Sequence, residues 1–268
     1  MPPSDPIVIT VDTEWAHPLV LADLLDLLDA YGVTATLFCT GPVEARGHEV
    51  AIHPNFRRGG DAVRSLLARP ANEAAAWDDA LIYRGVLAQM RETFPDAIGS
   101  RSHSLIYDSA LLPELAAAGF RYDSTYMTPL RSVAPFPKEH GVWEIPIYYM
   151  DHVDLITTAT GFRVEALGLD GPGLKVFDFH PNMVFINAAT ETQYLDSKSC
   201  YHDPRALLSY RSEGGGVRSL LVALLERVRS DAIATSTLRE VYEAAASNPI
   251  GDGRSSGTGS RAARSERS

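Results

Sequence analysis

The chain has 268 residues, of which 45% are hydrophobic and 22% are charged. This length and composition allow one large domain with a substantial core and exclude disorder over the whole chain. Because 24 Lys and Arg residues face 34 Asp and Glu residues, the formal net charge is −10. Nucleic acid and anionic membrane surfaces, which attract cationic proteins, are therefore not expected partners.

Cysteine use and hydropathy bear on compartment and membrane association. Cys39 and Cys200 are too few for a cysteine-rich zinc module or a disulfide scaffold, which favours a reducing compartment. The first residues lack the basic and apolar regions of a signal peptide, and no segment reaches the ~18 apolar residues of a membrane span. We expect a cytoplasmic protein without membrane insertion, and no pattern indicates its oligomeric state.

The chain opens with a strand, a helix and a second strand. Residues 8–11 form a short β-branched run, and Pro18 then begins a helical repeat of leucines that Gly32 ends. Residues 34–40 again have the composition of a strand. Connections this short are typical of a parallel β-α-β unit.

The same alternation continues to about residue 245. Further strands are expected at 49–52, 98–103, 120–123, 142–149 and 174–179, and further helices at 82–94, 109–119, 217–228 and 238–245. Strands that alternate with helices over such a length fit an α/β barrel better than two open sheets. We therefore predict one domain that spans residues 1–247.

Two segments lack this alternation. Residues 190–216 show no clear hydrophobic period and are expected to form a long loop, of the kind that often lines a site. Residues 248–268 are rich in Gly, Ser and Arg and contain almost no apolar side chains. We expect this second segment to be a disordered tail.

Polar side chains follow several of the predicted strands at the point where each strand ends. They are Asp12 and Glu14 after the first strand, His53 after the third, Arg101 and His103 after the fourth, and Asp178 and His180 after a later one. Residues two apart in a strand point to the same face, and the chemistry of parallel barrels collects at the C-terminal rim. These carboxylates, imidazoles and one guanidinium are therefore predicted to converge.

Such a set of side chains indicates metal-assisted hydrolysis. Carboxylate and imidazole ligands suit a divalent transition metal, and an incomplete ligand set leaves a position for water or substrate. Asp12 and Glu14 can divide metal binding and proton transfer between them. Arg101 can keep a carboxylate ionised, and a remaining histidine can protonate the leaving group. The alternative for the two carboxylates is a structural role at the N-terminus of the following helix.

Five motifs occur in a fixed order: Ile-Thr-Val-Asp-Thr-Glu at 9–14, Ala-Thr-Leu-Phe-Cys-Thr at 35–40, Ile-His-Pro-Asn at 52–55, Arg-Ser-His-Ser at 101–104 and Phe-His-Pro-Asn at 179–182. Together they resemble the polysaccharide deacetylases, the NodB-homology group or carbohydrate esterase family four. Within that family the pattern looks most like the WbmS-type branch found in lipopolysaccharide O-antigen clusters. The resemblance covers roughly residues 7–245.

The resemblance implies an α/β fold, a distorted (β/α) barrel of about seven parallel strands that is related to the TIM barrel. It also implies one divalent metal, with Zn²⁺ as the first candidate, and removal of acetyl groups from N-acetylated sugars in surface polysaccharide biosynthesis. A carbohydrate is the implied partner. By position in the motifs, Asp12 matches the catalytic base, Glu14 a metal ligand and Arg101 the arginine that pairs with the base. His53 matches the first ligand histidine, and His180 matches the general acid.

The main departure from the family pattern is Arg57, which stands where the family has its second ligand histidine. We expect His103 to supply the missing ligand. The implied metal ligands are therefore Glu14, His53 and His103. The family's fourth motif, an Asp-Trp pair, is absent, and Asp151 and Asp154 are loose candidates for its aspartate.

Two other functions are compatible with the same residues. One is hydrolysis of another non-peptide C–N bond, as in allantoinase-like or deformylase relatives, which substrate screening separates from deacetylation. The other is a non-catalytic, carbohydrate-binding barrel, which Arg57 motivates and which failure to bind metal would favour. The substrate sugar and the choice among Zn²⁺, Fe²⁺, Co²⁺ and Ni²⁺ are also left open.

Overall fold

The computed structural model describes residues 5–68 and 78–247 of the chain. The described strands are β1 (Ile7–Asp12), β2 (Thr36–Cys39), β3 (Glu49–Ile52), β4 (Gly99–Ser100), β5 (Tyr122–Asp123), β6 (Phe136–Pro137), β7 (Trp143–Glu144), β8 (Tyr149–Met150), β9 (Lys175–Phe179) and β10 (Thr235–Ser236). They form one sheet in the order β6-β7-β5-β4-β3-β2-β1-β9-β8, with β10 also paired to β1. Every pair is parallel except β6 with β7.

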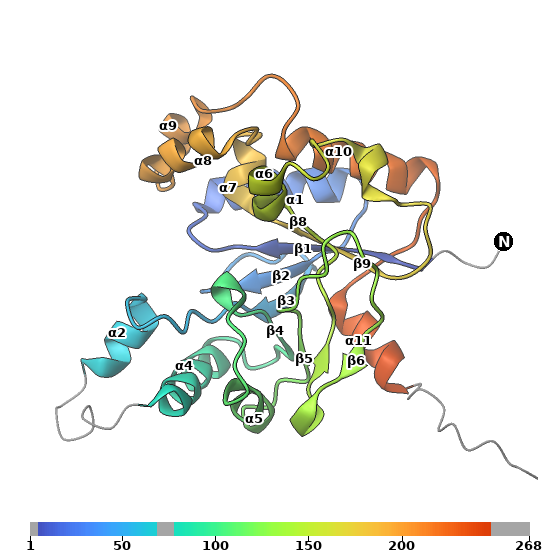
Figure 1. Cartoon of the computed structure of the whole chain (residues 1–268). Helices are drawn as coiled ribbons and strands as arrows, with labels where there is room; N and C mark the ends of the chain where they lie inside the picture. Colours follow the sequence, from blue (N-terminus) through green and yellow to red (C-terminus); the bar gives the residue numbers. More distant parts are fainter. Residues whose placement is uncertain (1–4, 69–77, 248–268) are drawn as a thin grey trace, which may run out of the picture.

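The described helices pack around this curled sheet, most of them on its outer face (Figure 1). They are α1 (Pro18–Ala30), α2 (Asp61–Leu67), α4 (Asp79–Thr93), α5 (Leu111–Ala117), α6 (Asp151–Thr157), α7 (Pro181–Phe185), α8 (Glu191–Ser197), α9 (Pro204–Leu208), α10 (Val217–Ser230) and α11 (Leu238–Ser247). Helix α7 contacts both α1 and α10 on one side, and α4 contacts α5 on the other. The prediction of a distorted, mostly parallel (β/α) barrel is confirmed, although the sheet has ten strands when the two-residue strands are counted.

The two faces of the sheet bury different side chains because strand residues alternate between faces. Along β1, Val8 contacts the apolar cluster inside the curl, while Ile7, Ile9 and Val11 belong to the larger cluster under the helices. Helix α11 contributes Leu238 to the inner cluster. On the inner face, β1 therefore continues from Val8 through Thr10 to Asp12, from apolar to polar.

The outer helices pack through regular apolar stripes. Helix α10 buries six residues at helical spacing, namely Val217, Leu220, Leu221, Leu224, Leu225 and Val228. Burying one such side chain contributes about 1.5–3 kcal/mol before the loss of conformational entropy is counted. Burial of these six side chains therefore holds α10 in place. Proline at the first position of α1 and the His17 side chain, which accepts a hydrogen bond from the Leu19 N–H, define where α1 begins.

The predicted long loop at 190–216 is wrong. Residues 191–197 and 204–208 form α8 and α9, joined by a short 3₁₀ turn. The start signals were present: Thr190 accepts a hydrogen bond from Gln193 N–H, and Asp203 precedes Pro204 at the first helical position. These helices are too short to show a hydrophobic period, so the period alone missed them.

The predicted strand at 142–149 is also wrong in its extent. It divides into β7 and the beginning of β8, with Pro146 between them. Proline lacks the N–H that a continuous strand would donate to its neighbour. The predicted tail, 248–268, lies outside the described residues, and the single domain at 1–247 stays a prediction.

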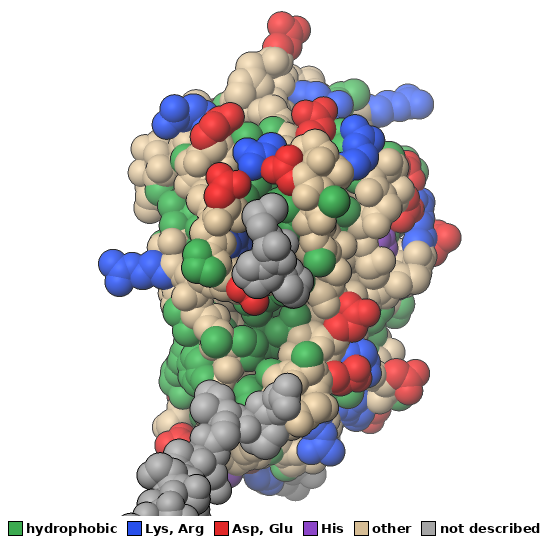
Figure 2. All heavy atoms as spheres, turned by 90° about the vertical axis from the view of Figure 1, so that its right-hand side faces the viewer, with side chains coloured by type: hydrophobic (Ala, Val, Ile, Leu, Met, Phe, Trp, Pro, Cys, Tyr) green, Lys and Arg blue, Asp and Glu red, His purple; other side chains and the backbone are tan. Residues whose placement is uncertain are grey.

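Figure 2 shows the end of the molecule at which β1 and β9 begin. Hydrophobic side chains gather near its centre, charged side chains surround them, and few histidines are visible on this face. In the described ranges no helix is both long and apolar enough to cross a bilayer.

Gly99 lies in β4, two residues before Arg101, and a side chain there would collide with Tyr122. A Cβ atom at Gly99 would lie 2.0 Å from the Tyr122 ring, and that ring is fully buried. We expect Gly99→Ala to lower the free energy of unfolding by about 1–3 kcal/mol, the usual cost of overpacking. Urea unfolding measures this change. Gly41→Ala, which meets no atom within 4 Å, is the matched control, and equal stability of the two variants would contradict the prediction.

Candidate active site

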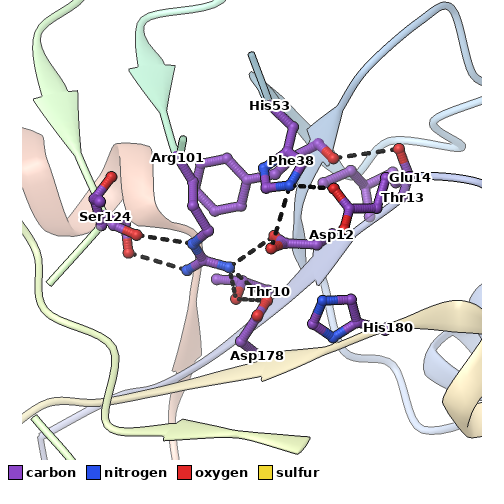
Figure 3. A network of polar contacts seen from close by, with 12 residues as sticks. Thr10, Asp12, Thr13, Glu14, Phe38, His53, Arg101, Ser124, Asp178 and His180 are labelled. Carbon is purple, nitrogen blue, oxygen red and sulfur yellow. Dashed lines mark hydrogen bonds and ion pairs between the residues drawn. The ribbon is translucent and has the colours of Figure 1, made fainter. Parts of the chain in front are cut away.

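The predicted site residues gather where the parallel strands end. A cleft of about 430 Å³ opens there, and five of the six predicted residues line it: Asp12, Glu14, His53, His103 and His180. The sixth, Arg101, is fully buried. Figure 3 shows Arg101 between Asp12, Asp178 and Ser124, with His53 on the other side of Asp12.

Arg101 holds the carboxylates of two strands together. Its guanidinium donates to Asp12 Oδ1 at 2.9 Å and also to Asp178 Oδ1. Thr10, which lies opposite Asp178 in the register of β1 and β9, donates to the same Asp178 oxygen at 3.0 Å. The rest of the guanidinium donates to Ser124 O and Oγ at 2.8 and 3.0 Å. Arg101 is thus fixed on every side.

The pKa values of the two carboxylates beside Arg101 are shifted in opposite directions. Burial opposes ionisation of Asp12, but the charges of His53 and Arg101 outweigh it and lower its pKa. Burial raises the pKa of Asp178 to about 7, because Arg101 offsets it only in part and the charge of Asp12 adds to it. Asp12 is therefore the stronger acid of the two, and its ionised carboxylate can accept a proton.

Glu14, His53 and His103 form a compact cluster. Glu14 Oε2 lies 2.6 Å from His53 Nε2 and 2.6 Å from His103 Nδ1. Burial opposes ionisation of Glu14, but its close contacts with His103 and His53 outweigh burial and lower its pKa strongly. One ligand atom from each of the three side chains lies within 4.8 Å of the others.

The chemistry of this cluster fits a divalent metal. Both ring nitrogens of His53 are buried: Nδ1 has no hydrogen-bond partner among the described residues, and Nε2 meets Glu14 Oε2 at 2.6 Å without the geometry of a hydrogen bond. Buried polar atoms normally make well-formed hydrogen bonds, so a nitrogen that approaches a carboxylate this closely without such geometry indicates a missing partner between the two. Two imidazoles and one carboxylate are a ligand set typical of catalytic zinc, which leaves a position for water or substrate. Asp12, Asp178 and His180 form a second candidate group.

His180 is oriented by Asp151. His180 Nδ1 lies 2.7 Å from Asp151 Oδ1, and the backbone N–H of His180 donates to Asp151 Oδ2 at 2.8 Å. Burial opposes protonation of His180, but the charge of Asp151 raises its pKa well above the ordinary value. With Nδ1 occupied, Nε2 remains for the cleft, where a protonated imidazole can donate.

The backbone around the cleft is unusual. Trp15, Ser104 and Leu105 have positive φ angles of 54°, 60° and 52° although none is glycine. Such conformations cost energy and cluster at functional sites. The Trp15 side chain is 52% exposed, and its ring lies edge-on to His103 at 5.0 Å. An aromatic surface therefore stands beside the candidate metal ligands.

Sequence reasoning missed several residues of this site. The sequence places Asp178 at a strand end, but its contact with Arg101 depends on how the strands are arranged in the sheet. Asp151 and Asp154 were the two candidates for the aspartate of the fourth motif. Asp151 contacts His180, whereas Asp154 accepts hydrogen bonds from the Tyr149 hydroxyl and the Thr160 N–H. In the cleft wall, His152, Tyr194 and Lys198 come from α6, α8 and the turn after α8.

The chain matches one family model, described as WbmS-like polysaccharide deacetylase, over residues 9–198. It belongs to this family. The matched segment contains all six predicted site residues. Comparison with curated protein sequences gives no match.

Solved structures agree with this assignment. A crystal structure of a WbmS protein from Bordetella bronchiseptica, described as a polysaccharide deacetylase involved in O-antigen biosynthesis, is 27% identical to this chain. The likeness covers 82% of this chain and 90% of that one, with a TM-score of 0.69. A polysaccharide deacetylase structure from Mycobacterium smegmatis is 18% identical over 92% of this chain and 93% of that one. Its TM-score of 0.57 shows likeness of fold alone.

In this WbmS-like chain, Arg101 is expected to be the main electrostatic support of the site. We expect Arg101→Met to lower the free energy of unfolding by about 3–5 kcal/mol, because it leaves the buried carboxylates of Asp12 and Asp178 without a cation. Urea unfolding gives the value. Arg46→Met removes an arginine from an exposed ion pair with Asp26 and is expected to change stability far less. A loss no larger for Arg101→Met than for this control would contradict the account.

Proposed function

We propose that this protein is a metal-dependent hydrolase that removes acetyl groups from N-acetylated sugars or polysaccharide precursors. The observation that carries the proposal is the placement of Glu14, His53 and His103 beside the Asp12–Arg101 pair on one cleft. Membership of the WbmS-like family supports the substrate class. The description of the Bordetella protein supports a role in O-antigen or similar surface polysaccharide synthesis.

The proposed metal ligands are Glu14, His53 and His103, with Zn²⁺ as the first candidate. A divalent ion held there would polarise the amide carbonyl and lower the pKa of water. His103 then fills the ligand role that Arg57 cannot, because a guanidinium stays protonated. Because this cluster has the chemistry of a metal site, we favour catalysis over a non-catalytic, carbohydrate-binding role.

The chain's own residues divide the proton transfers of amide hydrolysis. Asp12, ionised and held by Arg101, accepts a proton from the attacking water. The water oxygen bonds to the carbonyl carbon, and the C–N bond then breaks. His180, held by Asp151, donates a proton to the departing nitrogen. The products are acetate and a free amino sugar.

Location and metal identity belong to the same proposal. Both Cys39 and Cys200 are free thiols, which is consistent with the proposed cytoplasmic location. Cell fractionation tests the location, and elemental analysis of the purified protein tests the metal.

Acetate release from a panel of N-acetyl sugars tests the proposed activity. We expect release that requires a divalent metal and stops with a chelator. Cyclic ureides and formamides in the same panel test the alternative C–N hydrolases. Turnover of these compounds alone, without acetate release from any sugar, would contradict deacetylation.

A further inference from the structure

Arg57 and Lys198 are two cations in the wall of the cleft that the proposed chemistry does not use. Arg57 follows β3 on the side of α2, and Lys198 follows α8. These two helices lie on either side of the end of the sheet where β1–β3 finish (Figure 1). The two cations thus reach the same cleft from different walls.

Neither cation is neutralised by the part of the chain that the structure describes. The backbone N–H of Arg57 donates to Asn55 Oδ1 at 3.0 Å, and no described carboxylate pairs with its guanidinium. The Lys198 ammonium lies over the Tyr194 ring, 4.5 Å from its centre, without an ion pair to a described carboxylate. That contact limits where the ammonium can move.

The acidic groups of the cleft are already engaged. Asp12 contacts Arg101 and His53, and Glu14 contacts His53 and His103. The protein as a whole carries a formal charge of −10, which would repel an anion at long range. Two cations without an ion pair to a described carboxylate, in the same cleft as Asp12 and Glu14, are therefore a local exception. They suit a ligand group of opposite charge.

We propose that the N-acetyl sugar substrate carries an anionic group, a phosphate or a carboxylate, that Arg57 and Lys198 bind while the acetamide lies at the Glu14–His53–His103 cluster. Guanidinium binds such oxyanions through two parallel hydrogen bonds, and ammonium adds a point charge. This inference rests on the proposed function for its acetamide, but the binding of the anion can be measured separately.

The first arm of the test measures acetate release from neutral and anionic substrates. The probes are N-acetylglucosamine, its 1-phosphate, its nucleoside diphosphate derivative and N-acetylglucosaminuronic acid. We expect Arg57→Gln with Lys198→Gln to raise KM for the anionic probes about tenfold with little change in kcat, as for loss of uniform binding. KM for the neutral sugar should not change, and the preferred anionic probe identifies phosphate or carboxylate.

The second arm measures binding without turnover. N-acetylglucosamine 1-phosphate is titrated into the full-length protein by calorimetry, once with bound metal and once after chelation. Comparing the two affinities distinguishes binding of the phosphate by Arg57 and Lys198 from binding by the metal. We expect the double variant to bind about tenfold more weakly in both states. Arg57→Lys with Lys198→Arg should restore most of the affinity, and Arg205→Gln, an exposed cation of α9, should leave it unchanged.

The outcomes separate this inference from the proposed function. Acetate release without any change of KM or affinity in the double variant would overturn anion binding and leave deacetylation standing. No acetate release from any sugar would overturn deacetylation, and the calorimetric arm would still decide whether Arg57 and Lys198 bind the anion. Equal affinity of parent and double variant for every anionic probe overturns the inference.

Discussion

Asp12→Asn is expected to lower kcat for acetate release by about 10²- to 10⁴-fold, the usual contribution of a positioned general base. The amide keeps the shape of the side chain but cannot accept the proton of water. Because Asp12 lies outside the Glu14–His53–His103 cluster, metal content should stay near that of the parent. Steady-state kinetics and elemental analysis of one preparation measure both quantities.

Two controls make this result specific. The free energy of unfolding shows whether the variant folds, since Arg101 keeps Asp178 as a partner when Asp12 is replaced. Asp170→Asn, which changes an exposed residue that contacts Arg227, should keep full activity. A kcat for Asp12→Asn within about threefold of the parent would remove Asp12 from the role of base.

Glu14→Ala is expected to weaken metal binding by about 100-fold or more. Loss of residues that merely orient metal ligands costs about 10- to 100-fold in affinity, and a ligand should cost at least as much. Glu14 Oε2 is also the atom that both imidazoles approach. Competition with a chromogenic chelator gives the affinity, and acetate release should fall in parallel.

The matched control for this change is Glu165→Ala, an exposed glutamate in the short 3₁₀ helix at 164–167. It should bind metal as tightly as the parent. If Glu14→Ala retained both metal and turnover, the assignment of the ligand cluster would be wrong.

The parallel order of the strands explains how much of the site was predictable. Asp12 is the last residue of β1 and Glu14 lies in the turn that follows, so both carboxylates lie at the same end of that strand. His53 and Arg101 directly follow β3 and β4, and His103 begins the short 3₁₀ helix after β4, so the parallel order of the strands brings all three to one rim. The fold class, the rim and its residue types therefore followed from local pattern.

Contacts that depend on register or on distant turns were not predictable in this way. Thr10 meets Asp178 because β1 and β9 pair in one particular register. Asp151 reaches His180 across 29 residues of sequence, from the first turn of α6. Lys198 enters the cleft only because 191–197 fold as a helix. No hydrophobic period encodes these contacts.

Anomalous diffraction from crystals of the metal-loaded protein tests the central claim most directly. The account predicts one strong peak whose ion lies about 2.0–2.2 Å from an oxygen of Glu14 and from a nitrogen of each of His53 and His103. Its place should be the same with Zn²⁺ and Co²⁺. An ion bound instead by Asp12, Asp178 and His180, or no ordered ion at the cleft, would contradict the account.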